Sequence, residues 1–316
     1  LSCIQVAGFK EENIHVLLYS PKGRPVPEKW DELKRVYPKL NIFVYEDKGV
    51  QQYLGIYIPV LRPHLLWQHF QKFPELELET IVYTDCDILW TEQLDIEKYF
   101  DDNVCYISDA RSYLNYDYFK SKRSQVIPDK LEEYDKRDIL QEVCDIVGVD
   151  KQIVIDNNSN TGGVQYILKG MTAEFWKKVE KDVIAIRVHL MNNVNKTFFK
   201  NENVGFQSWC ADLWAVLYNL WYYDKEVKVV KEMDFAWASD PIERLGKVGI
   251  FHNAGVVSDS FNGLPAFYKG KYHTGNSPID DPHLQEILNN EQSKKWCTWW
   301  YTKKLYDLYE KYKINY

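Results

Sequence analysis

The chain has 316 residues, 45% of them hydrophobic, and a formal net charge of −7. This length and apolar content suit one large α/β domain, and no basic stripe outweighs the acidic residues, which argues against a nucleic-acid-binding protein. No apolar run is long enough to predict a membrane span. The six cysteines are scattered without a metal-binding spacing, which indicates reduced thiols and favours a cytoplasmic setting.

Strands and helices alternate along the first third of the chain. We predict strands at 13–19 and 40–45, and helices at 1–8, 30–37 and 62–73. A further apolar, β-branched run opens with Ile81 and leads to Asp85. This alternation predicts an α/β fold with a doubly wound, mostly parallel sheet flanked by helices.

The most informative motif is the pair Asp85 and Asp87 at the end of that run. In a strand, residues two apart point to the same side, so we expect the two carboxylates to converge while Cys86 faces the other way. Like charges this close repel unless a cation lies between them, and carboxylate oxygens suit Mn²⁺ or Mg²⁺. A solvated turn is the alternative, but the place after an apolar strand favours a metal–diphosphate site.

The second half continues the pattern with one interruption. We predict strands at 103–107, 160–168, 226–230 and 249–255, and helices at 131–149, 173–190, 205–221 and 291–316. In the helix at 205–221, Trp209, Leu213 and Val216 share one face. We expect 1–316 to form one domain, with 110–150 as an insertion and 291–316 as a C-terminal helical extension.

Three motifs occur along the chain in an order that is typical of one enzyme family. They are Asp85 with Asp87, an Asn-small-Gly-Val strand entry that starts at Asn160, and a His-x-x-Gly that starts at His252. With these motifs the chain resembles the metal-dependent nucleotide-sugar glycosyltransferases of the GT-A fold. It is most similar to the retaining group that includes glycogenin and the bacterial lipopolysaccharide galactosyltransferases.

The resemblance runs from the first helix to about Lys271. It implies that the family's first strand, which contacts the nucleobase, precedes Leu1. An anchor or targeting segment upstream of Leu1 is the alternative to a cytoplasmic protein.

The resemblance also implies how a metal and a diphosphate are held. His252 is the implied third metal ligand, and a neutral imidazole suits Mn²⁺ beside two carboxylates. A hydrogen-bonded core histidine is the alternative. Gly255 is implied to let the backbone approach phosphate closely. Arg62, Lys269 and Lys271 are implied to add positive charge at the diphosphate, with a solvated loop as the alternative for the two lysines.

The resemblance also implies which residues face the donor sugar, although the chain departs from the family pattern at one of these positions. Asn160 is implied to face the donor sugar. The family more often shows an Asp-Gln pair where this chain has Phe206 and Gln207. We therefore expect Gln207 or Asp212 to face the anomeric carbon, and Glu202 is a further candidate.

Together these features predict a glycosyltransferase that moves a hexose or pentose from a nucleotide diphosphate sugar, a UDP-sugar, to a hydroxyl of a glycan or glycoconjugate. We expect Mn²⁺ or Mg²⁺ as cofactor and retention at the anomeric carbon. The alternatives are an inverting transferase with Asp212 or Asp240 as base, and a sugar-nucleotide pyrophosphorylase or other nucleotidyltransferase. A carbohydrate-binding module is a third alternative, and it needs no metal site.

The predicted insertion, 110–150, is expected to shape the acceptor side. Its tyrosines Tyr113, Tyr116 and Tyr118 offer amphipathic rings of the kind that stack on sugars. Two surface helices with no ligand are the alternative.

Overall fold

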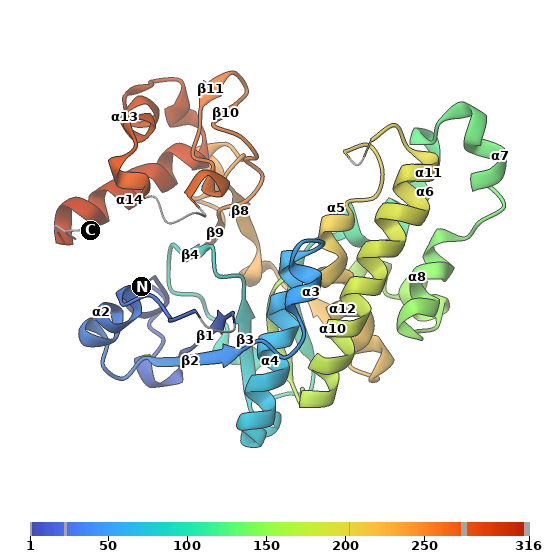
Figure 1. Ribbon diagram of the computed structural model, residues 1–316, viewed down its shortest axis with the longest axis horizontal. Coiled ribbons are helices and arrows are strands. Elements are labelled where there is room, and N and C mark those ends of the chain that lie inside the picture. The colour runs from blue at the N-terminus through green and yellow to red at the C-terminus, as the bar shows by residue number, and fades with distance from the viewer. Residues whose placement is uncertain (1, 22–23, 202, 273–276, 313–316) are drawn as a thin grey trace. The chain divides into compact units, whose positions relative to one another are not determined.

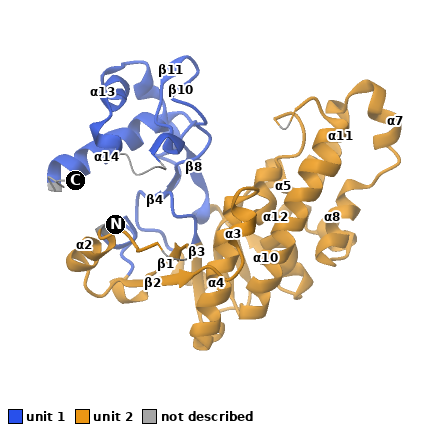
Figure 2. Ribbon diagram, viewed as in Figure 1, with its two compact units in different colours: residues 1–9, 84–95, 232–316 blue, residues 10–83, 96–231 orange. Residues whose placement is uncertain are grey.

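The computed structural model describes residues 2–21, 24–201, 203–272 and 277–312. The chain divides into two compact units, which Figure 2 shows in different colours. Unit 1 comprises Leu1–Phe9, Thr84–Asp95 and Glu232–Tyr316, and unit 2 comprises Lys10–Tyr83 and Ile96–Lys231. Each unit is therefore assembled from segments that lie far apart in the sequence.

Unit 2 contains most of the helices and the larger sheet (Figure 1). Its described strands are β1 His15–Ser20, β2 Asn41–Glu46, β3 Thr80–Thr84, which ends at the unit boundary, β5 Cys105–Asp109, β6 Gly162–Lys169 and β7 Val227–Val229. Its described α-helices are α2 Lys29–Val36, α3 Gln51–Leu54, α4 Leu61–Lys72, α5 Arg111–Leu114, α6 Tyr116–Ser121, α7 Leu131–Tyr134, α8 Ile139–Val147, α9 Lys151–Asp156, α10 Ala173–Val188, α11 Lys196–Phe198 and α12 Ala211–Tyr222.

Unit 1 contains a small three-stranded sheet in the order β4-β9-β8. β4 pairs with β9 in antiparallel fashion, and β8 pairs with β9 in parallel. Its described elements are α1 Ser2–Gln5, β4 Ile88–Trp90, β8 Phe235–Trp237, β9 Ile250–His252, β10 Ser260–Phe261, β11 Leu264–Pro265, α13 Pro282–Asn289 and α14 Cys297–Tyr312.

The predicted α/β fold is confirmed, but the described strands form several small sheets of mixed direction. β1 pairs with β2 in parallel, and a four-stranded sheet has the order β3-β6-β5-β7. Within it, β5 runs parallel to β7 and antiparallel to β6. The connection from β5 to β6 consists of several short helices, and β6 returns antiparallel to β5.

Local capping explains where the core helices begin and end. In α8, the Asp138 carboxylate accepts a hydrogen bond from the Gln141 N–H, and Gly148 ends the helix in the left-handed region, with φ of 85°. The buried face of α8 carries Ile139, Leu140, Val143, Cys144 and Val147. In α10, the Thr172 hydroxyl accepts from the Phe175 N–H, and the helix packs against α4 and α12.

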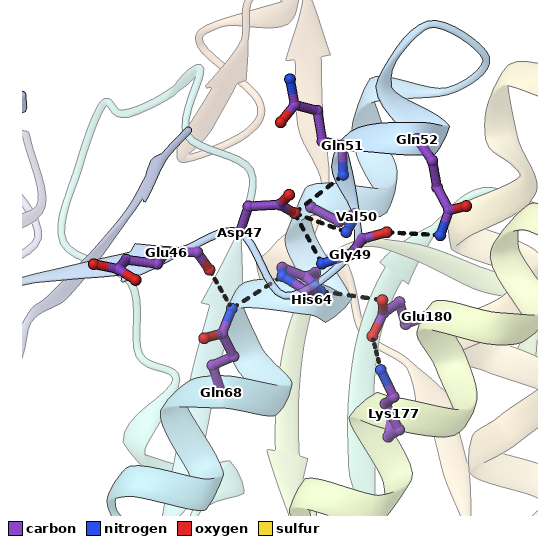
Figure 3. Close-up of polar contacts among 10 residues, drawn as sticks. All are labelled: Glu46, Asp47, Gly49, Val50, Gln51, Gln52, His64, Gln68, Lys177 and Glu180. Atoms are coloured by element: carbon purple, nitrogen blue, oxygen red, sulfur yellow. Dashed lines mark hydrogen bonds and ion pairs between the residues drawn. The ribbon is translucent and has the colours of Figure 1, made fainter. Parts of the chain in front are cut away.

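Figure 3 shows the polar contacts that join α4 to α10. Gln68 donates from Nε2 to the Glu46 carbonyl, at 3.1 Å, and to His64 Nε2, at 2.9 Å. His64 Nε2 is therefore an acceptor, so His64 Nδ1 donates to Glu180 Oε1, at 3.1 Å. Burial raises the pKa of Glu180, but the hydrogen bonds from His64 and Lys177 outweigh it and lower the pKa overall. The same figure shows Asp47 Oδ1 accepting from the backbone N–H groups at the start of α3.

Several predicted boundaries are wrong. The first helix is a single turn, Ser2–Gln5, and Leu1 lies outside the described residues. The helix predicted at 131–149 is divided into α7 and α8. The helix predicted at 205–221 begins only at Ala211, because the Asn195 amide bonds both the N–H and the carbonyl of Phe206 and holds that segment out of a helix.

Two aromatic expectations are corrected by burial. Trp209 is 58% exposed, whereas Leu213 and Val216 are buried, so Trp209 does not share their face. Tyr118 is buried, and its ring packs edge-on against Phe206. Tyr118 therefore belongs to the core and has no free face for a sugar. None of the described helices combines the length and apolar character needed to cross a bilayer.

Candidate metal centre

The predicted acidic pair lies in a turn, and the strand geometry expected for it is wrong. β3 ends at Thr84 and β4 begins at Ile88, so Asp85, Cys86 and Asp87 form the bend between two strands. The carboxylates converge because the chain bends there, and Cys86 is exposed.

The pairing of β4 with β9 brings the predicted histidine to this bend. Ile88 lies opposite His252 in the antiparallel register. The Asn253 N–H donates to the Asp87 carbonyl, at 2.9 Å, and extends the pairing beyond the strands. Residues more than 160 positions apart in the chain are thus held side by side by backbone hydrogen bonds within unit 1.

Asp85, Asp87 and His252 form one cluster. His252 Nε2 lies 3.5 Å from Asp85 Oδ2 and 3.3 Å from Asp87 Oδ1. One ligand atom from each residue lies within 4.8 Å of the other two. Two hard oxygens and one imidazole nitrogen at this spacing fit a divalent ion such as Mn²⁺ or Mg²⁺.

The orientation of His252 comes from aromatic packing. Its ring stacks on Trp237 with the centroids 5.0 Å apart and the planes at 29°. Nδ1 is buried and makes no hydrogen bond within the part of the chain that the structure describes. The Nε2 atom faces two carboxylates, which differs from a core histidine satisfied by backbone groups.

Asp87 is held in its charged form. Burial raises the pKa of Asp87, but its hydrogen bonds and electrostatic interactions with His252 and Lys269 outweigh it and hold the pKa far below the ordinary value. Burial, together with the Asp87 charge, raises the pKa of the Tyr301 phenol to about 12. The cluster is therefore an anionic site with a neutral phenol near it at physiological pH.

The structure separates the two candidate lysines. Lys269 Nζ contacts Asp87 Oδ2 and so joins the cluster. Lys271 Nζ instead pairs with Asp281, at 2.6 Å, and lies 3.4 Å from Asp259. Only the first of the two lysines adds its charge to the acidic bend.

Gly255 occupies a position that requires glycine for reasons of packing. Its φ is 90°, in the left-handed region, and a Cβ atom there would collide with the Ser239 hydroxyl. The turn after β9 is thus closed tightly against Ser239.

Arg62 and Asp212 lie together in unit 2. Arg62 Nη2 forms an ion pair with Asp212 Oδ2. The fully buried Tyr57 hydroxyl, which has one proton to donate, lies 2.6 Å from Asp212 Oδ1 and also contacts the Trp209 carbonyl. Both oxygens of Asp212 therefore have donors, and the carboxylate holds Arg62 in place.

The predicted sugar-facing residues lie in two irregular segments of unit 2. Asn160 ends a 3-10 turn just before β6, and Val164 in that strand has φ of 80°, a conformation that is rare for a β-branched residue. Gln207 is exposed, with its Oε1 3.8 Å from Cys210 Sγ.

Two carboxylate candidates remain, Asp240 and Glu202. Asp240, the alternative base in unit 1, accepts a hydrogen bond from the Trp237 N–H, at 2.9 Å. Glu202 lies outside the described residues.

Sequence reasoning missed two residues of these sites, Tyr57 and Trp237. No local pattern pointed to Tyr57 or Trp237, because their partners are distant in sequence or are recognised only by ring packing.

The cluster of unit 1 is suited to binding an anionic oxygen ligand through a metal. Three protein ligands leave coordination positions on a divalent ion that phosphate oxygens commonly fill. Comparisons of the chain with protein-family models, with curated proteins and with solved structures found no match.

Proposed function

We propose that this chain is a metal-dependent glycosyltransferase of the GT-A type. It transfers a hexose or pentose from a UDP-sugar to a hydroxyl of a glycan or glycoconjugate, with retention at the anomeric carbon. The observation that carries the proposal is the convergence of Asp85, Asp87 and His252 on one point. The order of the three motifs in the chain supports it.

In this proposal the acidic bend holds the diphosphate end of the donor. Asp85, Asp87 and His252 hold Mn²⁺ or Mg²⁺, and the bound ion stabilises the negative charge that develops on the leaving diphosphate. Lys269, which already lies at Asp87, adds a second positive charge for the same oxygens.

Unit 2, taken by itself, carries a fixed cation and the polar side chains that the resemblance assigns to a nucleotide sugar. Asp212 and the Tyr57 hydroxyl orient Arg62, so its guanidinium is preorganised for an anionic ligand. Because both Asp212 oxygens are engaged, Asp212 is poorly placed to act as a general base, which supports retention over inversion. Gln207 and Asn160 are the proposed polar contacts to the donor sugar.

The test is a product analysis in two channels. The protein is incubated with Mn²⁺ and UDP-, GDP- or CMP-sugars, with a panel of methyl glycosides as acceptors, and separately with UTP and sugar 1-phosphates. We expect release of UDP from one UDP-sugar, lost with EDTA and in Asp87→Asn. Asp259→Asn, an exposed aspartate of the same unit outside the cluster, is the matched control and keeps activity.

Formation of pyrophosphate without release of UDP would assign the site to a nucleotidyltransferase. Activity that persists in EDTA and in Asp87→Asn would remove the metal from the mechanism. Binding of methyl glycosides without turnover of any donor would favour a carbohydrate-binding protein.

A further inference from the structure

Lys269 contacts the candidate metal centre from an exposed position, where a metal ion could replace its ammonium group. It opens the 3-10 turn Lys269–Tyr272, and its Nζ contacts Asp87 Oδ2. The Lys269 side chain is 48% exposed, whereas that of Asp87 is only 22% exposed. The carboxylate is thus fixed in the bend, and the ammonium reaches it from a solvent-facing turn.

The neighbouring lysine shows that this contact is specific to Lys269. Lys271, two residues further along the same turn, pairs with Asp281 and Asp259. The turn therefore sends its two ammonium groups to two separate acidic groups.

The cluster needs positive charge whether or not a metal is bound. Asp85 and Asp87 carry charges of the same sign. One carboxylate oxygen of Asp85 lies within 4.8 Å of one of Asp87. Lys269 supplies one positive charge to the cluster. A divalent ion held by the same Asp87 carboxylate would repel the ammonium at short range.

We infer that Lys269 is an internal cation that a divalent ion displaces from Asp87, which frees the ammonium for the diphosphate contact already assigned to it under the proposed function. The inference rests on the proposed metal site and deepens it. Since the side chain is half exposed, its ammonium can turn away from Asp87 into solvent. Metal and nucleotide diphosphate binding are then coupled, and each favours the other.

The experiment measures metal binding apart from catalysis. Mn²⁺ is titrated into the nucleotide-free chain and followed by the electron paramagnetic resonance signal of the free ion. Lys269→Gln, which removes the competing charge, is expected to bind Mn²⁺ about three- to fivefold more tightly than the wild type, the size expected for an exposed ion pair. Lys269→Arg keeps the charge and is expected to restore the wild-type affinity. Lys271→Gln, the matched control, is expected to leave the Mn²⁺ affinity unchanged.

The second measurement uses UDP as the probe. In the presence of Mn²⁺, Lys269→Gln is expected to bind UDP about tenfold more weakly than the wild type, because the anion loses a charge-assisted hydrogen bond. Circular dichroism checks that each variant is folded. The two expected effects have opposite signs, which a general loss of structure does not produce.

Unchanged or weaker Mn²⁺ binding in Lys269→Gln overturns the inference, as does equal tightening in Lys271→Gln. If neither the wild type nor Lys269→Gln binds Mn²⁺, the metal centre fails and both proposals fail with it. If Lys269→Gln binds Mn²⁺ more tightly but no donor is turned over, the inference stands and the glycosyltransferase proposal fails.

Discussion

Each unit contains a carboxylate that is paired with a cation, and the two pairs differ in their surroundings. In unit 2, Asp212 receives the Tyr57 hydroxyl on one oxygen and Arg62 on the other, and Tyr57 is fully buried. In unit 1, Asp87 faces His252 Nε2 on one oxygen and the half-exposed Lys269 on the other.

The difference in exposure indicates which of the two ion pairs, Asp212–Arg62 or Asp87–Lys269, can exchange its cation for another. Removing one member of a buried pair leaves an uncompensated charge and costs about 3–5 kcal/mol, whereas an exposed pair is worth at most about 1 kcal/mol. The Arg62–Asp212 pair, whose side chains are 26% and 7% exposed, lies nearer to the buried case, so we expect it to be a fixed part of unit 2. The contact between Lys269 and Asp87 is one that a divalent ion can replace.

The largest expected effect breaks the fixed pair. Asp212→Ala removes the partner of Arg62 and leaves the buried Tyr57 hydroxyl with one acceptor fewer, so we expect a loss of about 3 kcal/mol in the free energy of unfolding. Urea denaturation measures it, and Asp212→Asn separates the hydrogen bond from the charge. The control is Asp135→Ala, whose exposed pair with Arg123 is worth less than about 1 kcal/mol. Equal losses in the two Ala variants would show that Asp212 is not a structural partner.

A second cluster of unit 2 contains a histidine whose proton binding changes on folding; its members are the buried Tyr45 and His69 and the exposed His15. The Tyr45 hydroxyl lies 2.6 Å from His69 Nδ1, and His69 Nε2 lies 2.8 Å from His15 Nδ1. Burial, and then the charges of His15 and Lys72, lowers the pKa of His69 from 6.5 to about 4. Below pH 6.5 the unfolded chain therefore binds a proton that the folded chain does not, so stability falls as the pH drops and levels off below about 4.

The expected loss between these pH values is at most about 3 kcal/mol for this residue. It is read as the difference between the wild type and His69→Gln, because other groups titrate in the same range. Parallel stability curves for the two proteins between pH 7 and 4 would contradict the role of His69.

A smaller effect tests what orients the metal ligand. Trp237→Ala removes the ring on which His252 stacks, and we expect roughly tenfold weaker Mn²⁺ binding, as is typical when support of a metal-ligating histidine is lost. Isothermal titration calorimetry measures it. Trp209→Ala, an exposed tryptophan of unit 2, is the control and leaves the affinity unchanged. Equal affinities for the wild type and Trp237→Ala would mean that other contacts orient His252.

The sequence predicted which residues cluster in the candidate metal centre better than it predicted the backbone that holds them. Spacing and apolar context pointed to Asp85 and Asp87, but they suggested a strand where the chain bends, because a two-residue period does not distinguish a pleat from a tight turn. Lys269 and Lys271 were indistinguishable because they lie in one loop, and only the three-dimensional positions of Asp87 and Asp281 separate them.

Contacts between distant positions account for most of what could not be predicted. The helix α12 starts late because Asn195 holds Phe206, a contact across irregular backbone that helix periodicity does not report. The partner of Asp212, Tyr57, lies 155 residues away in the chain. The alternation of strands and helices was readable because it depends on local periodicity, whereas the direction of pairing depends on how each connection returns.

The central claim is that Asp85, Asp87 and His252 form one divalent-metal site, and a Mn²⁺ titration of three proteins tests it most directly. We expect the wild type and Asp259→Asn to bind one Mn²⁺ ion per chain with equal affinity. We expect Asp87→Asn, folded by circular dichroism, to bind it about a hundredfold more weakly, since a charged ligand is lost. A wild type that binds no Mn²⁺, or an Asp87→Asn variant that binds it as tightly as the wild type, would contradict the account.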